Sequence, residues 1–353
     1  MNISIIGAGN GGQAMAGHFA MLGHEVCLYN RSADRIRQLC ESKEIILREA
    51  LSGSAHIHKL SCNLNEALDY ADLIMVTTTA DAHHDLANSM AEFLRDGQTI
   101  VLNPGRTLGA YEFSTIVHKK TNKAVTIAEA QSLIYACRVE TPSTVRVIGV
   151  KDHVLLAACP ASDTHHVLHT LNAIYPCFVK AENVLVTSLE NIGAIFHPAV
   201  VMFNAATIER GQGFYFYNDM TPAIADFLEQ LDAERLNIGK AFGINLKPAV
   251  EWVSFAYKGI QGNTLCEKMR NNPAYFKILA PAALNSRLLL EDIPTGILPF
   301  IELAGMVGVK VPLMESVFNV SQALLKKEFR KTGRTLERLG LEGVSAKAFL
   351  KSL

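Results

Sequence analysis

Hydrophobic and polar positions in the first half of the chain alternate between two kinds of segment. Short β-branched or apolar runs predict strands, and the stretches between them carry good helix formers at helical spacing. We expect strands at ISII (3–6), HEVCLY (24–29), ADLIMVTTT (71–79), QTIVLNPG (98–105), AVTIAEA (124–130), VRVIGV (145–150) and HVLLAAC (153–159), and helices at 12–23, 33–42 and 82–94. This alternation predicts an α/β fold, a doubly wound and mostly parallel sheet, over residues 1–181.

After about residue 181 the strand signal fades and helical periodicity takes over. Residues 221–244 begin with Thr221 as N-cap and Pro222 at the first helical position, and Gly243 marks the predicted end of this helix. A similar pattern predicts a helix over 311–329. The segment 183–211 is almost entirely apolar or small, so we expect one long central helix, buried on most sides. Residues 182–353 should form an all-helical domain, tightly apposed to the first because no low-complexity linker separates them.

Composition agrees with two globular domains and limits the partners. A chain of 353 residues is longer than a single core usually supports, and 19% charged with 49% hydrophobic residues is an ordinary globular balance. A net charge of −1 gives no argument for a nucleic-acid or membrane partner. Seven scattered cysteines without a CxxC pair suit reduced, buried thiols. No basic leader precedes the first strand, so we expect a cytoplasmic protein.

Three glycines, Gly7, Gly9 and Gly12, lie between the first predicted strand and the first predicted helix. In a G-x-G-x-x-G loop the first glycine allows a tight turn, the second lets the backbone approach a pyrophosphate, and the third allows close helix–strand packing. The helix N-terminus then supplies partial positive charge. The loop, which also contains Asn10, therefore predicts dinucleotide binding.

The end of the second predicted strand indicates which dinucleotide binds. NAD-binding folds usually carry Asp or Glu there, to accept hydrogen bonds from the ribose hydroxyls, whereas this chain has Asn30, Arg31 and Ser32. Asn30 removes a charge that would repel a 2′-phosphate, and Arg31, with Arg35 one turn later, can pair with that phosphate. The pattern favours NADPH over NADH. The alternative is a solvated helix start capped by Ser32.

Two further strand ends contribute candidate cofactor contacts. Thr78 lies at the end of the third predicted strand, and Asn103, Pro104 and Gly105 lie at the end of the fourth. Because ligands of this fold gather at the carboxyl ends of strands, the second group could form the turn under the nicotinamide ribose. It could equally be a plain turn, and the two interpretations are compatible.

A second candidate site lies in the helical half. His197 stands among apolar residues and is followed by Pro198, which removes an amide and loosens the helix. Later in the chain the acidic pair Glu291 and Asp292 precedes a Pro/Gly turn. A carboxylate can fix the tautomer of a histidine and stabilise its cation, and Arg287 could bind a substrate carboxylate through two of its nitrogens. The alternative is a hydrogen-bonded core histidine.

Other polar and aromatic clusters carry weaker signals. His165 and His169 share a helix face, but no third ligand stands at a recognisable spacing, so residues 162–171 read as an exposed amphipathic helix and no metal site is predicted. His83 and His84 read as loop or helix-start residues. The aromatic stretch 211–219 could line a substrate pocket, although aromatic residues at such places usually pack.

The whole chain resembles the opine dehydrogenase family, in particular bacterial N-(1-carboxyethyl)amino-acid dehydrogenases. The matching stretches are GAGNGG, VLNPGRTLGAYEF, FHPAVVMFNAATIE, DAERLNIGKAFG, NPAY, LNSRLLLEDIPTGILPFIEL and FRKTGRTLERLGL. The resemblance implies a Rossmann domain followed by an all-helical domain, a catalytic pair at His197 and Asp292, and a substrate-binding arginine at Arg287. Relatives can carry an asparagine where this chain has Gly193, and Asn191 is no simple substitute for it.

The resemblance also implies a reaction. An amino acid and a 2-oxo acid, most often pyruvate, would condense to an imine that NADPH reduces to a secondary amine dicarboxylate, an opine. Two alternatives remain open: a reductase of free oxo acids with the same two-domain plan, and a nucleotide-binding module without catalysis. A homodimer is compatible with the helical domain, although nothing in the composition demands one.

Overall fold

A computed structural model describes residues 1–353, and the chain divides into two compact units. The first contains Met1–Gly105 and Gly109–Val184, and the second contains Arg106–Leu108 and Leu185–Leu353. The division at Val184 falls close to the boundary placed at residue 181 from the sequence. The assignment of Arg106–Leu108 to the second unit was not predicted.

Twelve strands are formed, all in the first unit. In chain order they are β1 (Asn2–Ile6), β2 (Glu25–Tyr29), β3 (Glu44–Glu49), β4 (Gly53–His56), β5 (Lys59–Ser61), β6 (Leu73–Val76), β7 (Thr99–Leu102), β8 (Thr126–Ala130), β9 (Tyr135–Thr141), β10 (Thr144–Val150), β11 (Val154–Cys159) and β12 (Phe178–Lys180).

Helices are distributed over both units. The first unit contains α1 (Asn10–Met21), α2 (Ala33–Ser42), α3 (Leu64–Tyr70), α4 (His83–Met90), α5 (Gly109–Lys120) and α6 (Thr164–Ile174), with the short 3₁₀ turns η1 (Ala80–Ala82) and η2 (Ala161–Asp163). Helix α7 (Val184–Leu189) begins at the division between the units. The second unit continues with α8 (Ile192–Phe203), α9 (Ala205–Glu209), α10 (Pro222–Ala241), α11 (Ala249–Ala256), α12 (Leu265–Asn271), η3 (Pro273–Tyr275), α13 (Arg287–Leu290), η4 (Ile293–Ile297), α14 (Leu298–Val307), α15 (Pro312–Leu325), η5 (Phe329–Lys331) and α16 (Ala346–Lys351).

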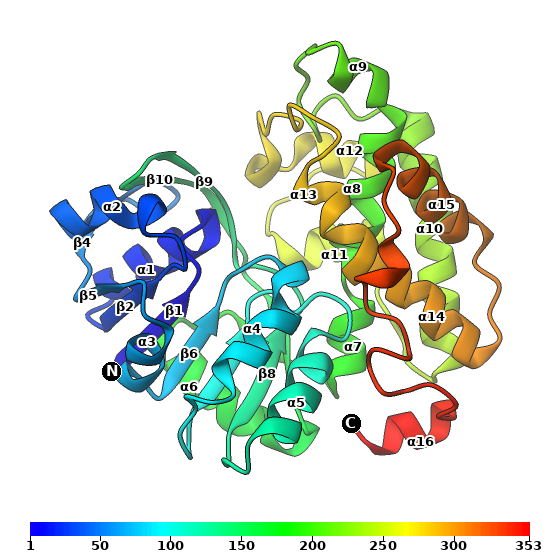
Figure 1. Cartoon of the computed structure of the whole chain (residues 1–353). Helices are drawn as coiled ribbons and strands as arrows, with labels where there is room; N and C mark the ends of the chain where they lie inside the picture. The colour runs from blue at the N-terminus through cyan, green and yellow to red at the C-terminus, as the bar shows by residue number, and fades with distance from the viewer. The chain divides into compact units, whose positions relative to one another are not determined.

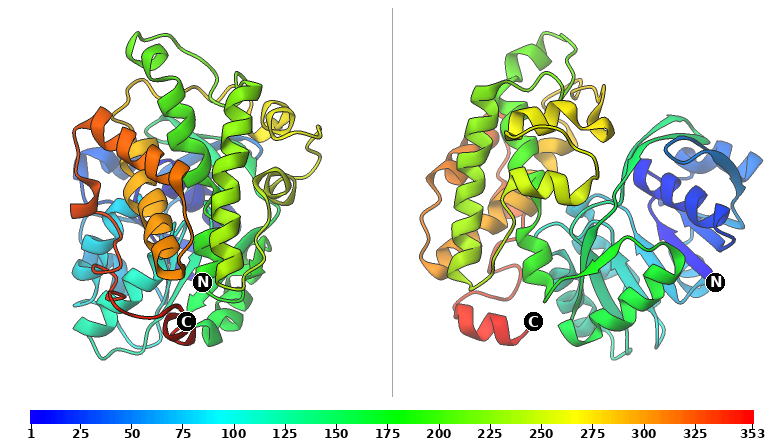
Figure 2. Two further views of the ribbon diagram at one scale, coloured as in Figure 1. Left: turned by 90° about the vertical axis from the view of Figure 1, so that its right-hand side faces the viewer. Right: turned by 180° about the vertical axis from the view of Figure 1, so that it is seen from behind.

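The main sheet of the first unit has the strand order β12-β11-β8-β7-β6-β1-β2-β5. All its neighbouring pairs are parallel except β8 with β11. Helices α3, α4 and α5 lie on one face of this sheet, and α1 and α6 lie on the other (Figures 1 and 2). The predicted doubly wound, mostly parallel sheet is therefore confirmed, and its architecture is Rossmann-like.

A second, four-stranded sheet with the order β4-β3-β10-β9 was missed in the sequence. The run VRVIGV, predicted as part of the main sheet, is in fact β10 of this second sheet. Helix α1 packs against strands of both sheets, and Met15 and Phe19 of this helix share one core with Ile45 and Val147. Because α1 is covered on two sides, almost all of its length is buried, which holds the glycine-rich loop at its N-terminus in place.

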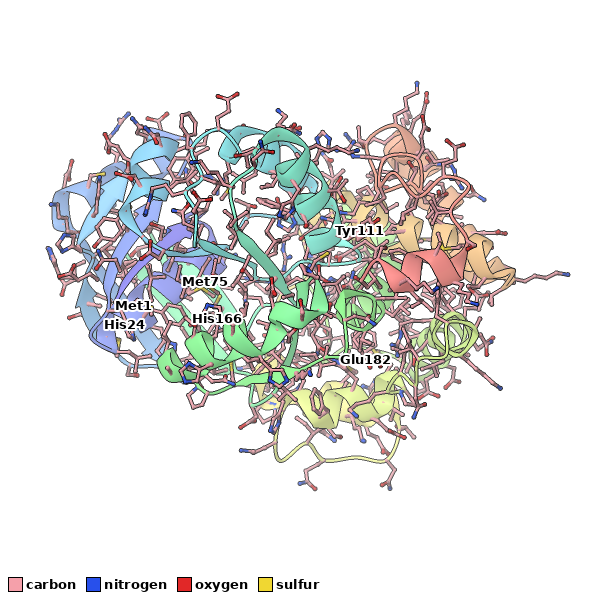
Figure 3. The ribbon with its side chains drawn as sticks, turned by 90° about the horizontal axis from the view of Figure 1, so that it is seen from below. Met1, His24, Met75, Tyr111, His166 and Glu182 are labelled. Atoms are coloured by element: carbon pink, nitrogen blue, oxygen red, sulfur yellow. The ribbon has the colours of Figure 1, made fainter.

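The parallel strands of the main sheet all begin at one of its ends and have their carboxyl ends at the other. Met1 and His24, labelled in Figure 3, lie next to each other where the strands begin, and the Glu25 amide donates a 3.0 Å hydrogen bond to the Met1 carbonyl. The carboxyl ends of the same strands lead into the loops that carry the predicted cofactor contacts.

The second unit is a helical bundle built around α8. This helix packs against α10, α13, α15 and η4 (Figure 1). Helix α10 starts as predicted, because the Thr221 hydroxyl accepts a hydrogen bond from the Ile224 amide and Pro222 occupies the first helical position. Gly243 adopts a positive φ of 77° just past its end. The α/β-plus-helical plan expected from the sequence is thus present.

The single long helix predicted over 183–211 is wrong, because the structure divides it into α7, α8 and α9. The first break falls at Asn191, with φ −73° and ψ 73°, and the second at Asn204. Glu190 and Asn191, at the first break, are almost completely buried, and their side chains accept hydrogen bonds from the Lys247 amide and the Arg106 guanidinium. An apolar pattern contains no signal for such breaks.

Several other predicted boundaries also differ. The helix expected to reach residue 329 ends at Leu325, and the one expected to reach 94 ends at Met90. The Pro/Gly stretch after Asp292 is no turn: η4 is a π-helical segment that continues into α14. Cys40 and Cys62 are exposed, so the interpretation of all cysteines as buried is wrong for these two.

Candidate functional site

The glycine-rich loop closes tightly between β1 and α1. Gly7 has a φ of 112°, and its amide donates a 2.9 Å hydrogen bond to the Tyr29 carbonyl of β2. A Cβ on Gly12 would lie only 1.7 Å from the Gly7 carbonyl oxygen, so no side chain fits there. A Cβ on Gly9 would meet nothing within 4 Å. The loop is therefore open at its middle glycine, where a pyrophosphate would lie against the α1 N-terminus.

Polar side chains around this loop divide into structural and exposed groups. Asn30 Oδ1 accepts a hydrogen bond from the Ala8 amide, and its Nδ2 donates to the Ser32 carbonyl, so Asn30 ties β2 to the loop. Asn10 Oδ1 accepts from the Val139 amide at 2.9 Å. Arg31 and Arg35 are both exposed. Asn10 and Asn30 therefore hold the site together, and the two arginines remain accessible to a phosphate.

Ser32 occupies the predicted N-cap position of α2, but its side chain makes no capping hydrogen bond. The residue is exposed, so its hydroxyl is accessible from solvent. The capping alternative for the segment 30–35 is thus only half realised: the position is right, and the capping bond is absent.

Buried polar atoms without a partner gather at the ends of three neighbouring strands. Asn103, completely buried after β7, has no hydrogen-bond partner for either amide atom, and the same holds for Gln131 after β8. The hydroxyls of Thr78, after β6, and Ser132 are also unpartnered. Because buried polar groups are normally satisfied, this edge suits a polar ligand such as the ribose and carboxamide of a nicotinamide nucleotide.

The turn beside Asn103 is shaped by the neighbouring strand. Pro104 is half-buried, and the Gly105 amide donates a 3.0 Å hydrogen bond to the Ala130 carbonyl at the end of β8. Together with the open glycine-rich loop, these residues fit a bound dinucleotide along the carboxyl edge of the main sheet.

In the second unit, His197 and Asp292 form a buried pair. His197 lies on α8 and Asp292 precedes η4, and His197 Nδ1 is 2.7 Å from Asp292 Oδ2. The histidine side chain is 14% exposed and the aspartate is fully buried. An ionised carboxylate accepts only, so Nδ1 carries the proton, and Nε2 is the nitrogen that can exchange one. The structure thus brings together two residues that are far apart in the sequence.

A buried arginine, Arg106, lies against the same carboxylates. Its Nε is 3.2 Å from Glu291 Oε1, and its Nη1 is 3.3 Å from Asp292 Oδ1 and 3.2 Å from Asn191 Oδ1. Burial alone would lower the pKa of Arg106, but the Asp292 and Glu291 carboxylates outweigh this and raise it above its usual value. Arg106 therefore stays a cation and fixes Asp292 through the oxygen that His197 does not use.

Gly193 makes room for this arginine. A Cβ at position 193 would lie 2.5 Å from Arg106 Nη1 and 3.2 Å from His197 Cε1. The position at which relatives can carry an asparagine is therefore filled here by the Arg106 guanidinium. Asn191, one of the partners of that guanidinium, donates through Nδ2 to the Thr107 hydroxyl at 3.2 Å. Gly193 is thus a requirement of this particular packing.

Aromatic residues contact the imidazole on the side away from Asp292. The Tyr217 hydroxyl is 3.2 Å from His197 Nε2, and the Phe216 ring meets the imidazole edge-on with centroids 6.0 Å apart. Tyr217 itself is stacked on Tyr275 at 4.1 Å. Packing, one of the two alternatives for the aromatic stretch 211–219, is present at Tyr217, and the substrate-pocket alternative stays a prediction.

Arg287 lies at the start of α13, one turn before Glu291. Its side chain is 49% exposed, and its Nη1 is 3.2 Å from Glu291 Oε2. Glu291 therefore lies between two arginines, one buried and one accessible. The structure does not place Arg287 in direct contact with His197 or Asp292, but its guanidinium is accessible to a substrate anion.

Sequence reasoning missed four polar residues of these sites. Arg106 and Tyr217 lie inside stretches that were already of interest, NPGRT and GFYFYND, but nothing local marks which side chain is buried. Gln131 and Ser132 directly follow a predicted strand, and the rule applied to Thr78 and Asn103 would also have found them. Only the fold shows that Arg106 reaches Asp292.

No group of three or more His, Cys, Asp or Glu residues is arranged to hold a metal ion. His165 and His169 are exposed on α6, which also carries His166, labelled in Figure 3.

One segment, Val184–Phe203, has the length and hydropathy of a membrane span, but most of it is buried within the fold. It covers α7 and α8 and is best explained as core, since buried core helices share this composition.

A dinucleotide-binding Rossmann-like unit, together with a helical unit that carries a buried histidine–carboxylate pair, defines a class of two-domain dehydrogenases. Comparison with known proteins agrees. Residues 2–134 match the family model for the NAD-dependent glycerol-3-phosphate dehydrogenase N-terminus. Residues 180–325 match the model for the NAD/NADP octopine/nopaline dehydrogenase alpha-helical domain.

The chain is 38% identical to the opine dehydrogenase of Arthrobacter sp. (strain 1C), over 97% of this chain and 96% of that protein. A solved octopine dehydrogenase with NADH and L-arginine superposes with a TM-score of 0.82 at 22% identity, covering 100% of this chain and 98% of the other. Yersinopine dehydrogenase with NADP+ gives a TM-score of 0.69 at 14% identity, with 97% and 93% coverage.

The chain belongs to the opine dehydrogenase family. It is an NAD(P)-dependent oxidoreductase that acts on CH–NH groups through reductive condensation, as the resemblance noted in the sequence implied.

Proposed function

We propose that this enzyme condenses an amino acid with pyruvate, or another small 2-oxo acid, and reduces the resulting imine with NADPH. The observation that carries the proposal is the buried pair formed by His197 Nδ1 and Asp292 Oδ2 at 2.7 Å. Further support comes from a solved octopine dehydrogenase whose title gives NADH and pyruvate. The product would be an N-(1-carboxyalkyl)amino acid, and the reaction would be reversible.

Each residue of the pair has a chemical role in this reaction. Attack of the amine on the ketone gives a carbinolamine, and imine formation requires a proton for the departing oxygen. Protonated His197 supplies that proton, while Asp292 keeps the ring oriented and stabilises its cation. The bound cofactor supplies the hydride.

Arg287 is proposed to bind the carboxylate of the oxo acid. Its half-exposed guanidinium is held on one side by Glu291, which leaves donors directed to solvent. A planar guanidinium can bind a carboxylate through two nitrogens, which would fix the orientation of the keto carbon.

The preference for NADPH rests on the end of β2. Arg31 and Arg35 are exposed there, and no acidic residue occupies the position that would accept hydrogen bonds from the adenosine ribose. A 2′-phosphate would meet positive charge, with Asn30 and Ser32 beside it. Gly7, Gly9, Asn10 and Gly12 would enclose the pyrophosphate, and the edge formed by Thr78, Asn103, Pro104 and Gly105 would hold the nicotinamide half.

The direct test is a panel of amino acids crossed with pyruvate and 2-oxoglutarate, with NADPH or NADH, followed at the absorbance of the reduced nicotinamide. Oxidation that requires both an amine and an oxo acid supports the proposal. Oxidation with the oxo acid alone would instead identify a reductase of free oxo acids. Cofactor binding without turnover on any pair would identify a nucleotide-binding module.

The cellular location and the oligomeric state of the enzyme follow from weaker observations. We expect a cytoplasmic enzyme, in keeping with its free cysteines, and a homodimer as one accessible assembly. Cell fractionation and light scattering on the purified protein test the two points separately.

A further inference from the structure

Both ring nitrogens of His197 have a hydrogen-bond partner within the protein. Nδ1 is bound to Asp292, and Nε2, which would exchange the proton with substrate, is 3.2 Å from the Tyr217 hydroxyl. A substrate oxygen must therefore either displace Tyr217 or receive its proton through Tyr217.

The surroundings of Tyr217 oppose displacement. Its ring stacks on Tyr275 with an interplanar angle of 20°, and Tyr275 in turn packs edge-on against Tyr257. Tyr217 is only 8% exposed, and Tyr275 is 7% exposed. Moving the phenol would break a buried stack, so the hydroxyl stays where it is when a ligand arrives.

The backbone on either side of Tyr217 is also held. The Phe216 amide donates to the Ile278 carbonyl at 2.7 Å, and the Ala280 amide donates to the Phe214 carbonyl at 2.9 Å. On the other side the Met220 amide donates to the Tyr217 carbonyl at 3.2 Å. The first two bonds fasten the segment to the chain between η3 and α13, and the third closes a local turn, so the backbone at Tyr217 is held in place.

The charges that face this pair are fixed. Asp292 lies on the opposite side of the imidazole, Arg106 lies behind Asp292, and Glu291 lies beside Arg106. The Tyr275 phenol stacks on Tyr217 and packs in turn against Tyr257, and burial raises the pKa of Tyr275 well above its ordinary value. Tyr275 therefore stays neutral near pH 7, and the imidazole of His197 is the acid–base group in direct contact with the Tyr217 hydroxyl.

We propose that Tyr217 is a catalytic residue that relays the proton between His197 Nε2 and the substrate oxygen. A phenol hydroxyl can accept one hydrogen bond while donating another, which is what a relay requires. The proposal rests on the proposed function, since it concerns the proton of carbinolamine dehydration.

The step balances as a double proton transfer. The carbinolamine C–O bond breaks, and its electron pair remains on the oxygen, which takes the proton from Tyr217 Oη. Oη takes the proton from Nε2 of the imidazolium, and the amine lone pair forms the C=N bond. Water leaves, the imidazole becomes neutral, and the iminium carries the positive charge.

The test compares Tyr217→Phe with wild type and with Tyr275→Phe. Both variants lose one buried hydroxyl from the same stack, but only the first removes the group on Nε2. We expect kcat of Tyr217→Phe to fall about 10²-fold with little change in either KM, and kcat of Tyr275→Phe to stay within about threefold. A proton inventory in mixed H₂O and D₂O should be curved for wild type, because two protons move, and lose that curvature in Tyr217→Phe.

Several results would overturn the relay. One is a Tyr217→Phe enzyme with wild-type kcat, and another is a variant whose KM rises while kcat and the proton inventory stay unchanged. Should Tyr217→Phe fail to fold, 3-fluorotyrosine at position 217 keeps ring and hydroxyl but lowers the phenol pKa. A relay then predicts an altered kcat and pH–rate profile, and an unchanged profile excludes it. Absence of turnover in wild type itself would reject the proposed function, and the relay with it.

Discussion

Replacing Arg106 with methionine should destabilise the helical unit strongly. The arginine side chain is 8% exposed, and it is the buried cation next to Glu291 and Asp292, whose side chains are 3% and 0% exposed. Removing one partner of a buried ion pair leaves an uncompensated charge and costs about 3–5 kcal/mol. Arg287 also contacts Glu291, but it is half-exposed, and such pairs contribute only about 0–1 kcal/mol.

The measurement can be made selective for this unit. Trp252, the one tryptophan of the chain, is 5% exposed on α11 in the second unit, so its fluorescence follows the unfolding of that unit. For a unit of this size each kcal/mol moves the midpoint by about 2–4 °C, so Arg106→Met should lower it by about 6–20 °C. Addition of Glu291→Gln should restore at least about 1 kcal/mol, because one unpaired carboxylate is removed.

Arg287→Met is the matched control, since it deletes an arginine from the same cluster at an exposed position. Its free energy of unfolding should stay within about 1 kcal/mol of wild type. An Arg106→Met protein with wild-type stability, to within about 0.5 kcal/mol, would refute the view that Arg106 balances the buried carboxylates.

Three further outcomes are expected. His197→Ala or Asp292→Ala should lower kcat about 10²–10⁴-fold while the NADPH dissociation constant, measured by fluorescence titration, stays nearly unchanged; a fully active variant contradicts the assignment. Arg31→Ala should weaken NADPH far more than NADH, and equal weakening argues against a phosphate contact. Gly193→Ala should lower the free energy of unfolding, followed by Trp252 fluorescence, by about 1–3 kcal/mol, because the new methyl group meets the Arg106 guanidinium 2.5 Å away; an unchanged stability shows that the arginine can move without cost.

Local patterns predicted the parts of this fold that local forces decide. Thr221 and Pro222 start α10 through capping and a preset φ, and the runs before Gly7 and Asn30 form β1 and β2. The break at Asn191 could not be predicted in this way, because the donor to its side chain, Arg106, comes from a distant segment.

The residues of the candidate site also fall into those that the sequence indicated and those that only tertiary contacts reveal. The sequence, with its family resemblance, indicated His197, Asp292 and Arg287 because their residue types match the chemistry. Arg106 and Tyr217 contribute through tertiary contacts alone: one fills the space left by Gly193, and the other stacks on Tyr275. Nothing within a few residues of either distinguishes it from a surface side chain.

The short excursion Arg106–Leu108 limits how this protein can be dissected. Ser188, Thr295 and Arg334 all hydrogen-bond to Thr107 or Leu108. The tripeptide Arg106–Leu108 is therefore an internal part of the bundle, although in the chain it lies between β7 and α5 of the other unit. A fragment that starts at Leu185 would lack the cation that lies between Glu291 and Asp292, and the partners of Thr107 and Leu108 would lose their hydrogen bonds. A folded product of the helical half alone would therefore need the tripeptide supplied again, for example through a linker that joins it to the fragment.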